Sequence, residues 1–490
     1  MVRTGRLTGP YYKMTLDIIE RQNGMKRGNN RGTQKRGGAK PNQMAGRLPR
    51  NAPPIEVEIT HIGGRGDGVA KVQYTHNYRE ADYDVFIPAS LPGERLLVQP
   101  LSLTTQGIKA RIIELLTPSP HRHAPRCDAF PICGGCSFQH WDKAEIGSWK
   151  TALTTGFLER AGVTPGDIRP LFVSASSSRR RASFHLKCFG DRAIVGFNER
   201  MGQHIIKPDG CVILHPSLIE LRDSLNEFAS THLPPGFTAD AHANLLQDRS
   251  SNDGANICLY IDTSKTIASL SPDILSALTS WAARIKLARL SVSDQGSALT
   301  LYAPDVPVIA FGSIAVSPPP GAFLQATLDG EAILQAAVAE AVGAARQIAD
   351  LFAGCGTLSL PLLDKLSDLH AVETNDSALA ALKAGADAAK LGGRVSLSDR
   401  NLFDAPLLPD ELDKFQAVIL DPPRTGAAAQ CEMLAKSSLP LVAMASCNPA
   451  TFARDAAILT KGGFQLDWVQ PIDQFLFSNH LELVGAFRRA

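Results

Sequence analysis

The chain has 490 residues, 44% of them hydrophobic, and a formal net charge of +2; this length excludes a single core and predicts about three domains. It contains no run of about 18 apolar residues and no apolar signal-peptide core at its start, so we expect a cytoplasmic protein without membrane spans. A transit peptide stays open, because residues 1–50 carry 12 of the 50 Lys and Arg residues but only 2 of the 48 Asp and Glu residues.

Residues 1–52 predict a basic, disordered arm. Their Gly, Asn and Gln content between Gly24 and Gly46 leaves little that could form a core. One interpretation is an arm that holds phosphates by charge alone. The alternative is a solvated tail, part of which would not exist if translation began at Met14 or Met25.

Residues 53–117 predict a small β-barrel. Short β-rich runs alternate there with Gly, Pro and Asn turns, which is typical of a five-stranded, OB-like barrel. The runs are Ile55–Ile59, Gly68–Val72, Asp84–Ile87, Arg95–Val98 and Ile108–Ile113. Such barrels often bind nucleic acid, and a structural spacer is the alternative.

Residues 118–320 predict a central mixed α/β domain that begins with a cysteine-rich segment. The candidate metal ligands are Cys127, Cys133, Cys136 and Cys211. The first three form C-x5-C-x2-C, and two intervening glycines let their sulfurs converge on one centre. Zinc usually shows two close pairs, so the three-plus-one pattern favours an iron–sulfur cluster over zinc. Chance clustering is the alternative, and Cys188 is a further thiol that could replace one ligand.

Residues 321–490 predict a doubly wound α/β domain with a mostly parallel sheet. Strands alternate there with amphipathic helices of about 10 to 15 residues. The expected strands are residues 347–352, 370–373, 395–397, 417–420, 441–445 and 481–484. In such sheets ligands bind outside the carboxyl ends of the strands, which is where we expect the site.

The segment from Asp350 to Leu362 predicts a nucleotide site built from a strand, a tight glycine turn and a helix. Glu373 ends the next strand, where a carboxylate can accept both hydroxyls of a ribose. The G-x-G spacing lacks a third glycine and a following lysine, so an adenosine cofactor without pyrophosphate fits, namely S-adenosylmethionine. Asn401, after the following strand, either binds the adenine edge or caps a helix.

Two further strand ends carry candidate catalytic residues. Cys447 stands where an apolar strand ends and a helix begins, and is the candidate nucleophile. About twenty residues upstream, Asp421 opens an Asp-Pro-Pro-Arg motif whose prolines stiffen the loop. Arg424 of this motif could orient the Asp or hold a phosphate. Together the two motifs predict chemistry on a planar heterocycle.

In combination these motifs resemble the RNA (uracil-5)-methyltransferase family, from about residue 55 to residue 490. The matching segments are Cys127–Trp141, Phe323–Gln325, Asp350–Leu362, Asp421–Gly426, Ser446–Asp455 and Asp473–Glu482. The resemblance implies that the barrel is a TRAM domain and that the cysteines hold a 4Fe–4S cluster. With barrel and cluster both present, the chain is most similar to the family's 23S ribosomal RNA enzymes, whereas the bacterial tRNA enzyme typically lacks both.

The resemblance also implies roles for individual residues. Cys447 would be the nucleophile and Glu482 the general base. The cofactor contacts would be Gln325, Phe352, Thr357, Glu373, Asn401 and Asp421. This agrees with the chemistry of uracil, whose carbon 5 becomes nucleophilic only after a soft, reversible nucleophile adds to carbon 6. A half-buried carboxylate at a strand start is expected to have a raised pKa, which suits proton removal near neutrality. His480 matches a family position too, but a structural role is common for a lone histidine.

Some positions depart from the family pattern, and other functions stay open. Thr357 and Thr327 stand where relatives often have Asn, and Leu476 where Pro is common. The alternatives are a tRNA uridine-5 methyltransferase, an amino-methyltransferase in which Cys447 and Glu482 would be idle, and a non-catalytic RNA-binding factor. We expect a monomer that acts on RNA; which uridine it modifies, and whether one or two, stays open.

Overall fold

The computed structural model describes residues 46–48, 52–76, 79–200, 202–246, 256–263, 270–294, 297–365 and 367–489. The chain forms two compact units, Met1–Trp149 with Phe477–Asn479, and Lys150–Leu476 with His480–Ala490. Nearly all of the basic arm lies outside the described residues, so its interpretation stays a prediction. Within the described ranges, no helix is both long enough and apolar enough to cross a membrane.

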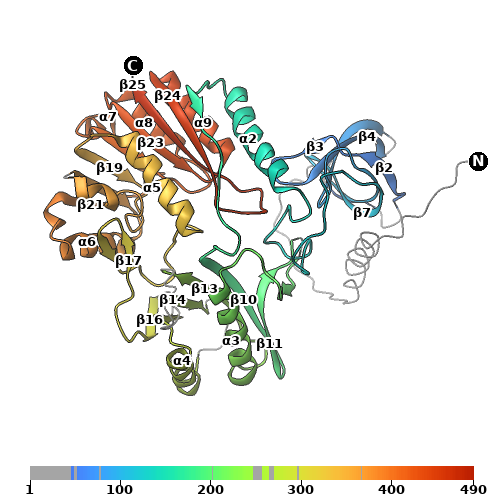
Figure 1. The fold of residues 1–490 in the computed structure, drawn as a ribbon, viewed down its shortest axis with the longest axis horizontal. Helices are drawn as coiled ribbons and strands as arrows, with labels where there is room; N and C mark the ends of the chain where they lie inside the picture. Colours follow the sequence, from blue (N-terminus) through green and yellow to red (C-terminus); the bar gives the residue numbers. More distant parts are fainter. Residues whose placement is uncertain are drawn as a thin grey trace, which may run out of the picture. The chain divides into compact units, whose positions relative to one another are not determined.

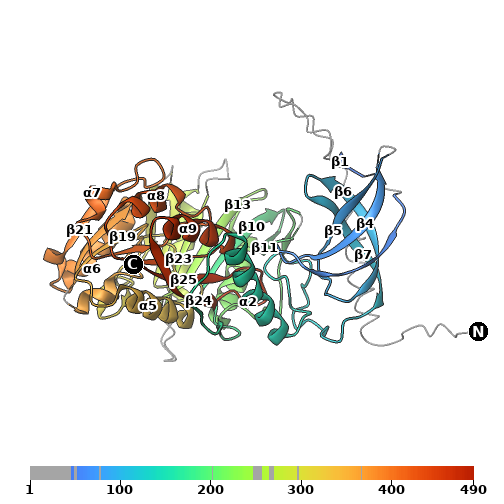
Figure 2. The ribbon, with the colours of Figure 1, turned by 90° about the horizontal axis from the view of Figure 1, so that it is seen from above.

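The first unit contains a β-barrel, seen in blue in Figure 2. Its strands are β1 (Gly46–Arg47), β2 (Ile55–Glu58), β3 (His61–Ile62), β4 (Gly68–His76), β5 (Arg79–Ile87), β6 (Arg95–Thr104) and β7 (Gly107–Thr117). The sheet order is β1-β6-β7-β5-β4-β3, with β2 on β6. The segment of β2 and β3 pairs with β6 at one end and β4 at the other, which closes the sheet. Backbone bonds from Ile59 to Glu94 (2.9 Å) and from Thr60 to Val69 (2.8 Å) complete this closure.

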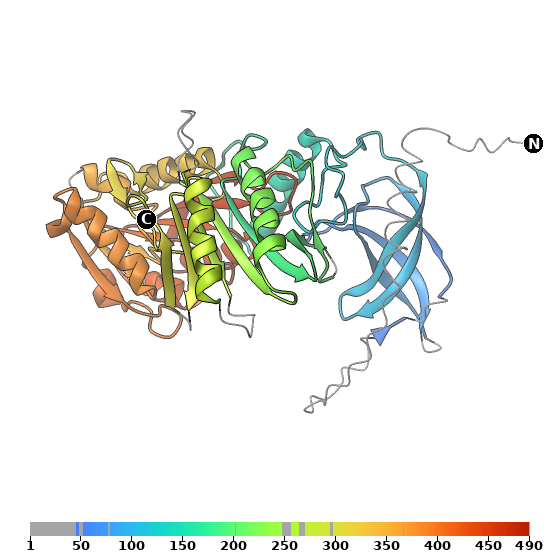
Figure 3. The same cartoon turned by 90° about the horizontal axis from the view of Figure 1, so that it is seen from below.

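The second unit contains a seven-stranded sheet in the middle of the chain. Its elements are β10 (Arg181–Phe189), β11 (Arg192–Asn198), β12 (Ile205–Ile206), α3 (Pro216–His232), β13 (Thr238–Leu245), β14 (Ile257–Asp262), α4 (Pro272–Arg284), β15 (Arg289–Asp294) and β16 (Ser297–Tyr302). The order is β12-β11-β10-β13-β14-β15-β16. Apolar residues of α3 and α4 pack against this sheet. Figure 3 shows the two helices, in green and yellow-green, on one face of it. A short hairpin, β17 (Ile309–Phe311) and β18 (Ile314–Val316), follows.

The same unit contains the nine-stranded sheet that carries the candidate site. Its elements are α5 (Leu328–Val342), β19 (Gln347–Leu351), β20 (Asp368–Glu373), α6 (Asp376–Ala388), β21 (Val395–Asp399), α7 (Pro409–Leu412), β22 (Ala417–Leu420), α8 (Ala428–Lys436), β23 (Leu441–Ser446), α9 (Pro449–Lys461), β24 (Phe464–Asp473) and β25 (Glu482–Arg489). Two short strands from earlier in the chain, β8 (Asp167–Ile168) and β9 (Phe172–Val173), join β24, and α2 (Lys143–Arg160) precedes them.

The strand order is β21-β20-β19-β22-β23-β25-β24-β8, and only β25 runs antiparallel to its neighbours. The mostly parallel, doubly wound sheet expected from the sequence is therefore confirmed. The expected strands are all present, but β24 was missed. A register shift between Leu466 and Trp468, together with Pro471, interrupts the alternation by which a strand is recognised.

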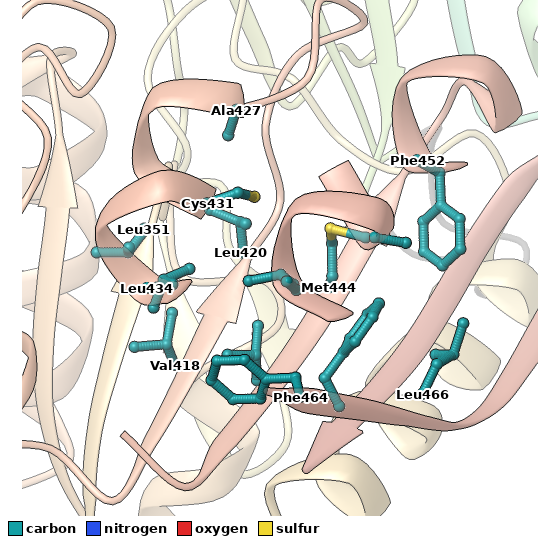
Figure 4. Close-up of a cluster of buried hydrophobic side chains, with 14 of the residues drawn as sticks. Leu351, Val418, Leu420, Ala427, Cys431, Leu434, Met444, Phe452, Phe464 and Leu466 are labelled. Atoms are coloured by element: carbon teal, nitrogen blue, oxygen red, sulfur yellow. The ribbon is translucent and has the colours of Figure 1, made fainter. Parts of the chain in front are cut away.

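Helices cover both faces of this sheet (Figure 1). Apolar residues of α5 pack on one face, while residues of α8 and α9 pack on the other. Figure 4 shows Cys431 and Leu434 of α8 and Phe452 of α9 around Val418 and Leu420 of β22. All four residues of β22 are buried, as expected for a parallel strand covered on both faces. This packing fixes the strands whose carboxyl ends carry the candidate residues.

Candidate active site

The predicted site residues gather at the carboxyl ends of neighbouring strands. Parallel pairing aligns β20, β19, β22 and β23, so their last residues lie along one edge of the sheet. Phe352, Glu373, Asp421 and Cys447 follow or end these strands. The sequence could indicate this arrangement because each residue directly terminates an apolar run.

The glycine turn after β19 is fastened to Glu373. Gly354 N donates to Glu373 Oε2 at 3.1 Å, while Oε1 accepts from the backbone of Thr374 (2.7 Å) and Asn375 (3.1 Å). Gly356 has φ +83°, and a Cβ there would overlap Leu360. The turn therefore requires glycine, and the carboxylate is held in place at the sheet edge.

An aromatic pair stands beside this turn. The rings of Phe352 and Phe403 have centroids 5.4 Å apart, and Phe403 is 47% exposed. Asn401 Oδ1 accepts from Phe403 N at 3.1 Å, so Asn401 caps the turn that presents this ring. Among the described residues no helix begins at this point, so the helix cap considered for Asn401 is replaced by a turn, and its contact with the cofactor stays a prediction. Phe403 itself was not predicted as a site residue, although an exposed aromatic two positions after Asn401 was a usable signal.

The turn before α5 carries Gln325, which is 6% exposed. Buried Arg180 donates to Gln325 O at 3.1 Å and forms an ion pair with Glu331, which lies in the first turn of α5. Thr327 Oγ1 accepts from Gly330 N at 3.1 Å and caps α5. The Thr327 departure from the family pattern therefore keeps the capping function, because a hydroxyl serves as well as an amide oxygen.

Cys447 lies between β23 and α9, partly buried. Asn448 caps α9 by accepting from Ala450 N at 3.1 Å, and its Nδ2 donates to Arg424 O at 3.0 Å. Thr451 Oγ1 donates to the same carbonyl at 3.3 Å. These bonds fasten the turn at Cys447 to the Asp-Pro-Pro-Arg loop, so the two motifs lie together as their positions in the sequence predicted.

Glu482 starts β25 and faces the same sheet end as Cys447. The antiparallel register pairs Ser446 with Leu483, so the residues just beyond this pair are Cys447 and Glu482. Glu482 is 6% exposed, which makes it more buried than the half-buried position expected from the sequence. Burial, followed by the charge of Asp421, raises the pKa of Glu482 to about 8.

Burial also raises the pKa values of the other acids of the site and of the thiol. Burial raises the pKa of Asp421 to about 6. Burial, with smaller contributions from Glu482 and Asp421, raises the pKa of Cys447 to about 12. Asp350, which the sequence analysis did not select as a site residue, has its pKa raised to about 7, chiefly by burial. The cluster therefore disfavours several negative charges at once.

Arg424 contacts a histidine within this cluster. Its Nη2 lies 3.1 Å from His480 Nδ1. Burial lowers the pKa of His480 to about 4, and the charge of Arg424 adds to this effect. His480 is therefore neutral at neutral pH and accepts the hydrogen bond from Arg424. This contact holds the His480 ring against the Arg424 side chain, while the Arg424 backbone carbonyl accepts from Asn448 in the Cys447 turn.

Three predicted cluster ligands lie in the first unit. Cys127, Cys133 and Cys136 are all buried. Gln139 Nε2 donates to Cys136 Sγ at 3.1 Å, and its Oε1 accepts from Cys127 N at 3.1 Å. Cys211 belongs to the second unit. Among the described residues, no three His, Cys, Asp or Glu side chains are grouped closely enough to hold a metal ion.

The doubly wound sheet with its strand-end site is the fold of a methyltransferase domain. Residues 313–441 match the family model "Methyltransferase small domain". The chain is 36% identical to an uncharacterized RNA methyltransferase of Brucella suis over 434 residues, covering 89% of this chain and 98% of the relative. It is 34% identical to one of Caulobacter vibrioides, covering 89% and 100%.

Two further comparisons concern uracil enzymes. A 23S rRNA (uracil(1939)-C(5))-methyltransferase of Alteromonas naphthalenivorans is 28% identical, with 90% of each chain covered. The Pyrococcus abyssi tRNA (uracil-54, C5)-methyltransferase structure is 19% identical and has a TM-score of 0.63, with 88% of this chain and 99% of that chain covered. The chain therefore belongs to the family of RNA methyltransferases that its motifs predicted.

Proposed function

We propose that this enzyme transfers a methyl group from S-adenosylmethionine to carbon 5 of a uridine in 23S rRNA. The observation that carries this proposal is the pairing of β23 with β25, which sets Cys447 and Glu482 at one sheet end beside Asp421. A thiol and a carboxylate with a raised pKa are the two groups that methylation of carbon 5 needs. Amino-methylation would need neither.

The first half of the reaction uses Cys447. Its thiol loses a proton to solvent, and Sγ forms a bond to carbon 6 of the uracil. The electron pair of the 5,6 double bond moves towards carbon 5 and the carbonyl at carbon 4, giving an enolate. Carbon 5 then attacks the methyl carbon of the sulfonium, and the bond from methyl to sulfur breaks to leave S-adenosylhomocysteine. The product of this half is a neutral adduct with both a methyl group and a hydrogen on carbon 5.

The second half uses Glu482. Its carboxylate removes the proton from carbon 5, the 5,6 double bond forms again, and the bond between carbon 6 and Cys447 Sγ breaks. A base with a pKa of about 8 suits this step, because it takes up a proton readily near neutral pH yet is ionised in a useful fraction of molecules. Sγ leaves as a thiolate and takes up a proton from solvent, Glu482 returns its proton to solvent, and 5-methyluridine leaves.

The cofactor would lie across the ends of β19, β20 and β21. Glu373, fixed by the glycine turn, offers its carboxylate to the ribose hydroxyls. Phe352 and Phe403 provide apolar ring surface for the adenine. The proposed contacts remain Gln325, Phe352, Thr357, Glu373, Asn401 and Asp421. Phe403 is added to this set because its exposed ring pairs with Phe352.

The choice of 23S rRNA is supported by the Alteromonas relative, which covers 90% of this chain. The closed barrel at residues 53–117 is proposed to be a TRAM-type RNA-binding module, since barrels of this kind commonly bind single-stranded nucleic acid. We propose that the enzyme acts as a cytoplasmic monomer. The P. abyssi neighbour acts on tRNA, so the tests below include tRNA.

We also propose that Cys127, Cys133, Cys136 and Cys211 bind a 4Fe–4S cluster. The chemistry of the donors fits: three buried thiols come from one short segment, and the Gln139 amide donates to one of them. Hydrogen bonds to ligand sulfurs are a usual feature of such clusters. No step of the methyl transfer uses this group, and iron analysis tests the assignment directly.

The Glu482→Gln variant tests the proposed reaction. With unmodified 23S rRNA and S-adenosylmethionine, it should methylate carbon 5 once and then stall as a covalent protein–RNA species that survives denaturing electrophoresis. The double variant Cys447→Ala with Glu482→Gln should form none. Unmodified tRNA transcripts are tested in parallel, and an adduct only with tRNA would move the substrate to tRNA. Normal release of product by Glu482→Gln would show that another residue is the base.

A further inference from the structure

Gln474 lies directly after β24 in a buried and tightly held stretch of backbone. It is 2% exposed. Lys150 Nζ forms a buried ion pair with Asp473 Oδ1 at 2.6 Å and donates to Phe475 O at 3.4 Å. Phe475 N also donates to Asp473 Oδ1 at 3.0 Å. The residues on both sides of Gln474 are therefore fixed, which restricts where its side chain can point.

The amide of Gln474 has a defined orientation. Ala326 N donates to Gln474 Oε1 at 2.9 Å, and Gln474 Nε2 donates to Gln325 Oε1 at 2.7 Å. A peptide N–H can only donate, so the oxygen of the amide must face Ala326 and its nitrogen must face Gln325. The register of β24 and β25 pairs Ile472 with Glu482, so Gln474 lies near the start of β25, where hydrogen bonding from its side chain lowers the pKa of the Glu482 carboxyl. The NH2 group carries two hydrogens, so while one is donated to Gln325, the second is available to the carboxylate.

This hydrogen bond acts on the charged form of Glu482. It lowers the pKa of the carboxyl, as Arg424 also does, against the raising effects of burial and Asp421. Cys447 also faces Glu482, because the two residues lie just beyond the Ser446–Leu483 pair, and its raised pKa keeps it a neutral thiol. Gln474 is thus the neutral donor that offsets part of the cost of an ionised base in this buried cluster.

We propose that Gln474 is a positioning residue that holds the carboxylate of Glu482 and the amide of Gln325 in one fixed arrangement for proton removal from carbon 5. The proposal rests on the proposed role of Glu482 as the base. Gln474 acts through its two partners and not on the uridine itself. Its loss should slow the second half of the reaction and leave the first half intact.

The Gln474→Met variant tests this, because Met has a similar length but makes no amide hydrogen bonds. The substrate is the unmodified 23S rRNA or tRNA transcript that the wild type methylates, with tritium on carbon 5 of uridine and a labelled methyl group on the cofactor. Methyl incorporation into RNA reports the first half, and tritium release reports proton removal. We expect wild-type methyl incorporation in a single turnover. Tritium release at pH 7 should be about tenfold slower, with its pH midpoint about one unit higher.

A matched control is Gln430→Met. Gln430 is 1% exposed, and its amide also uses both atoms: Oε1 accepts from Leu407 N at 2.8 Å and Nε2 donates to Leu407 O at 3.2 Å. It lies on α8, outside the proposed catalytic and cofactor residues. Its replacement removes a comparable pair of hydrogen bonds, so it should reproduce any loss of stability while leaving the pH midpoint of tritium release unchanged.

A second variant, Gln474→Glu, keeps the shape of the side chain and replaces the donor with a carboxyl group. It should raise the pH midpoint of tritium release further than Gln474→Met does. It also tests the proposal if Gln474→Met does not fold. An unchanged midpoint in the folded variants, or equal slowing at every pH, overturns the positioning role. The Glu482→Gln variant separates the two assignments. If it releases tritium normally, the base assignment is wrong; if it stalls while the Gln474 variants behave as wild type, only the positioning role is wrong.

Discussion

Replacing the proposed base, Glu482, with its amide should stabilise the protein while it stops the reaction. Glu482 is almost fully buried, and its pKa is raised from 4.5 to about 8. An acid whose pKa is higher in the folded state favours folding in its protonated form. The stability it contributes is complete below pH 4.5 and is lost as the pH rises through 8. The amide introduced by Glu482→Gln stays neutral throughout this range, so the variant should show no such loss.

The size of the effect follows from the same pKa. Each pH unit between the two pKa values corresponds to about 1.4 kcal/mol, so ionisable Glu482 costs about 3 kcal/mol at pH 7 compared with a group that stays neutral. Between pH 6 and pH 8 the cost should grow by about 2 kcal/mol. Glu482→Gln should therefore be more stable than wild type, and the gap should widen with pH.

Hydrogen exchange of the β25 amides at pH 6, 7 and 8 measures this locally, since Glu482 opens that strand. Glu432, exposed on α8, supplies the control variant Glu432→Gln, which should follow the wild type at every pH. Parallel protection of wild type and Glu482→Gln from pH 6 to pH 8 would refute the reasoning. It would mean that Glu482 is ionised in the folded protein at little cost.

Three more outcomes follow from the site and the sequence. Cys447→Ala should abolish methyl transfer but keep S-adenosylmethionine binding, and turnover above a few per cent of wild type would contradict the covalent mechanism. The protein purified without oxygen should be brown and contain about four irons, and zinc in place of iron would contradict the cluster assignment. Replacing Cys127 or Cys211 should lower the stability of the protein more than its methyl-transfer activity. Removing residues 1–50 should weaken RNA binding and flatten its salt dependence without changing the site methylated, whereas equal slopes would leave the arm a solvated tail.

The sequence could predict the strand-end residues because, in a parallel sheet, a residue at the end of an apolar run lies at the edge where the ligand binds. Cys447, Asp421 and Glu373 each follow or end an apolar run, and the fold brings those ends to one edge. The sequence could not predict strand β24 in the same way. There the alternation is broken by a register shift and by a proline, so no run of the expected period exists.

Contacts between side chains that are far apart along the chain could not be predicted from the sequence either. Gln474 meets Gln325 across 149 positions, and Lys150 meets Asp473 across more than 300. Nothing in the spacing of these residues indicates that they are partners, because the contacts depend on how α2 and the turn before α5 pack at the end of β24. The degree of burial of Glu482 is of the same kind, since it depends on neighbours from several loops.

The charges of the site explain how a thiol and a buried carboxyl that lie close together can both take part in the proposed reaction. The charge of Asp421 raises the pKa of Glu482, and the charges of Glu482 and Asp421 raise the pKa of Cys447. During the first half of the reaction the negative charge of the thiolate moves into the uracil, where the incoming methyl group neutralises it. Glu482 then faces a neutral thioether, so its ionisation no longer competes with a thiolate. The order of steps therefore lets the cluster carry its charges in turn, and the Gln474 amide supports the one that comes last.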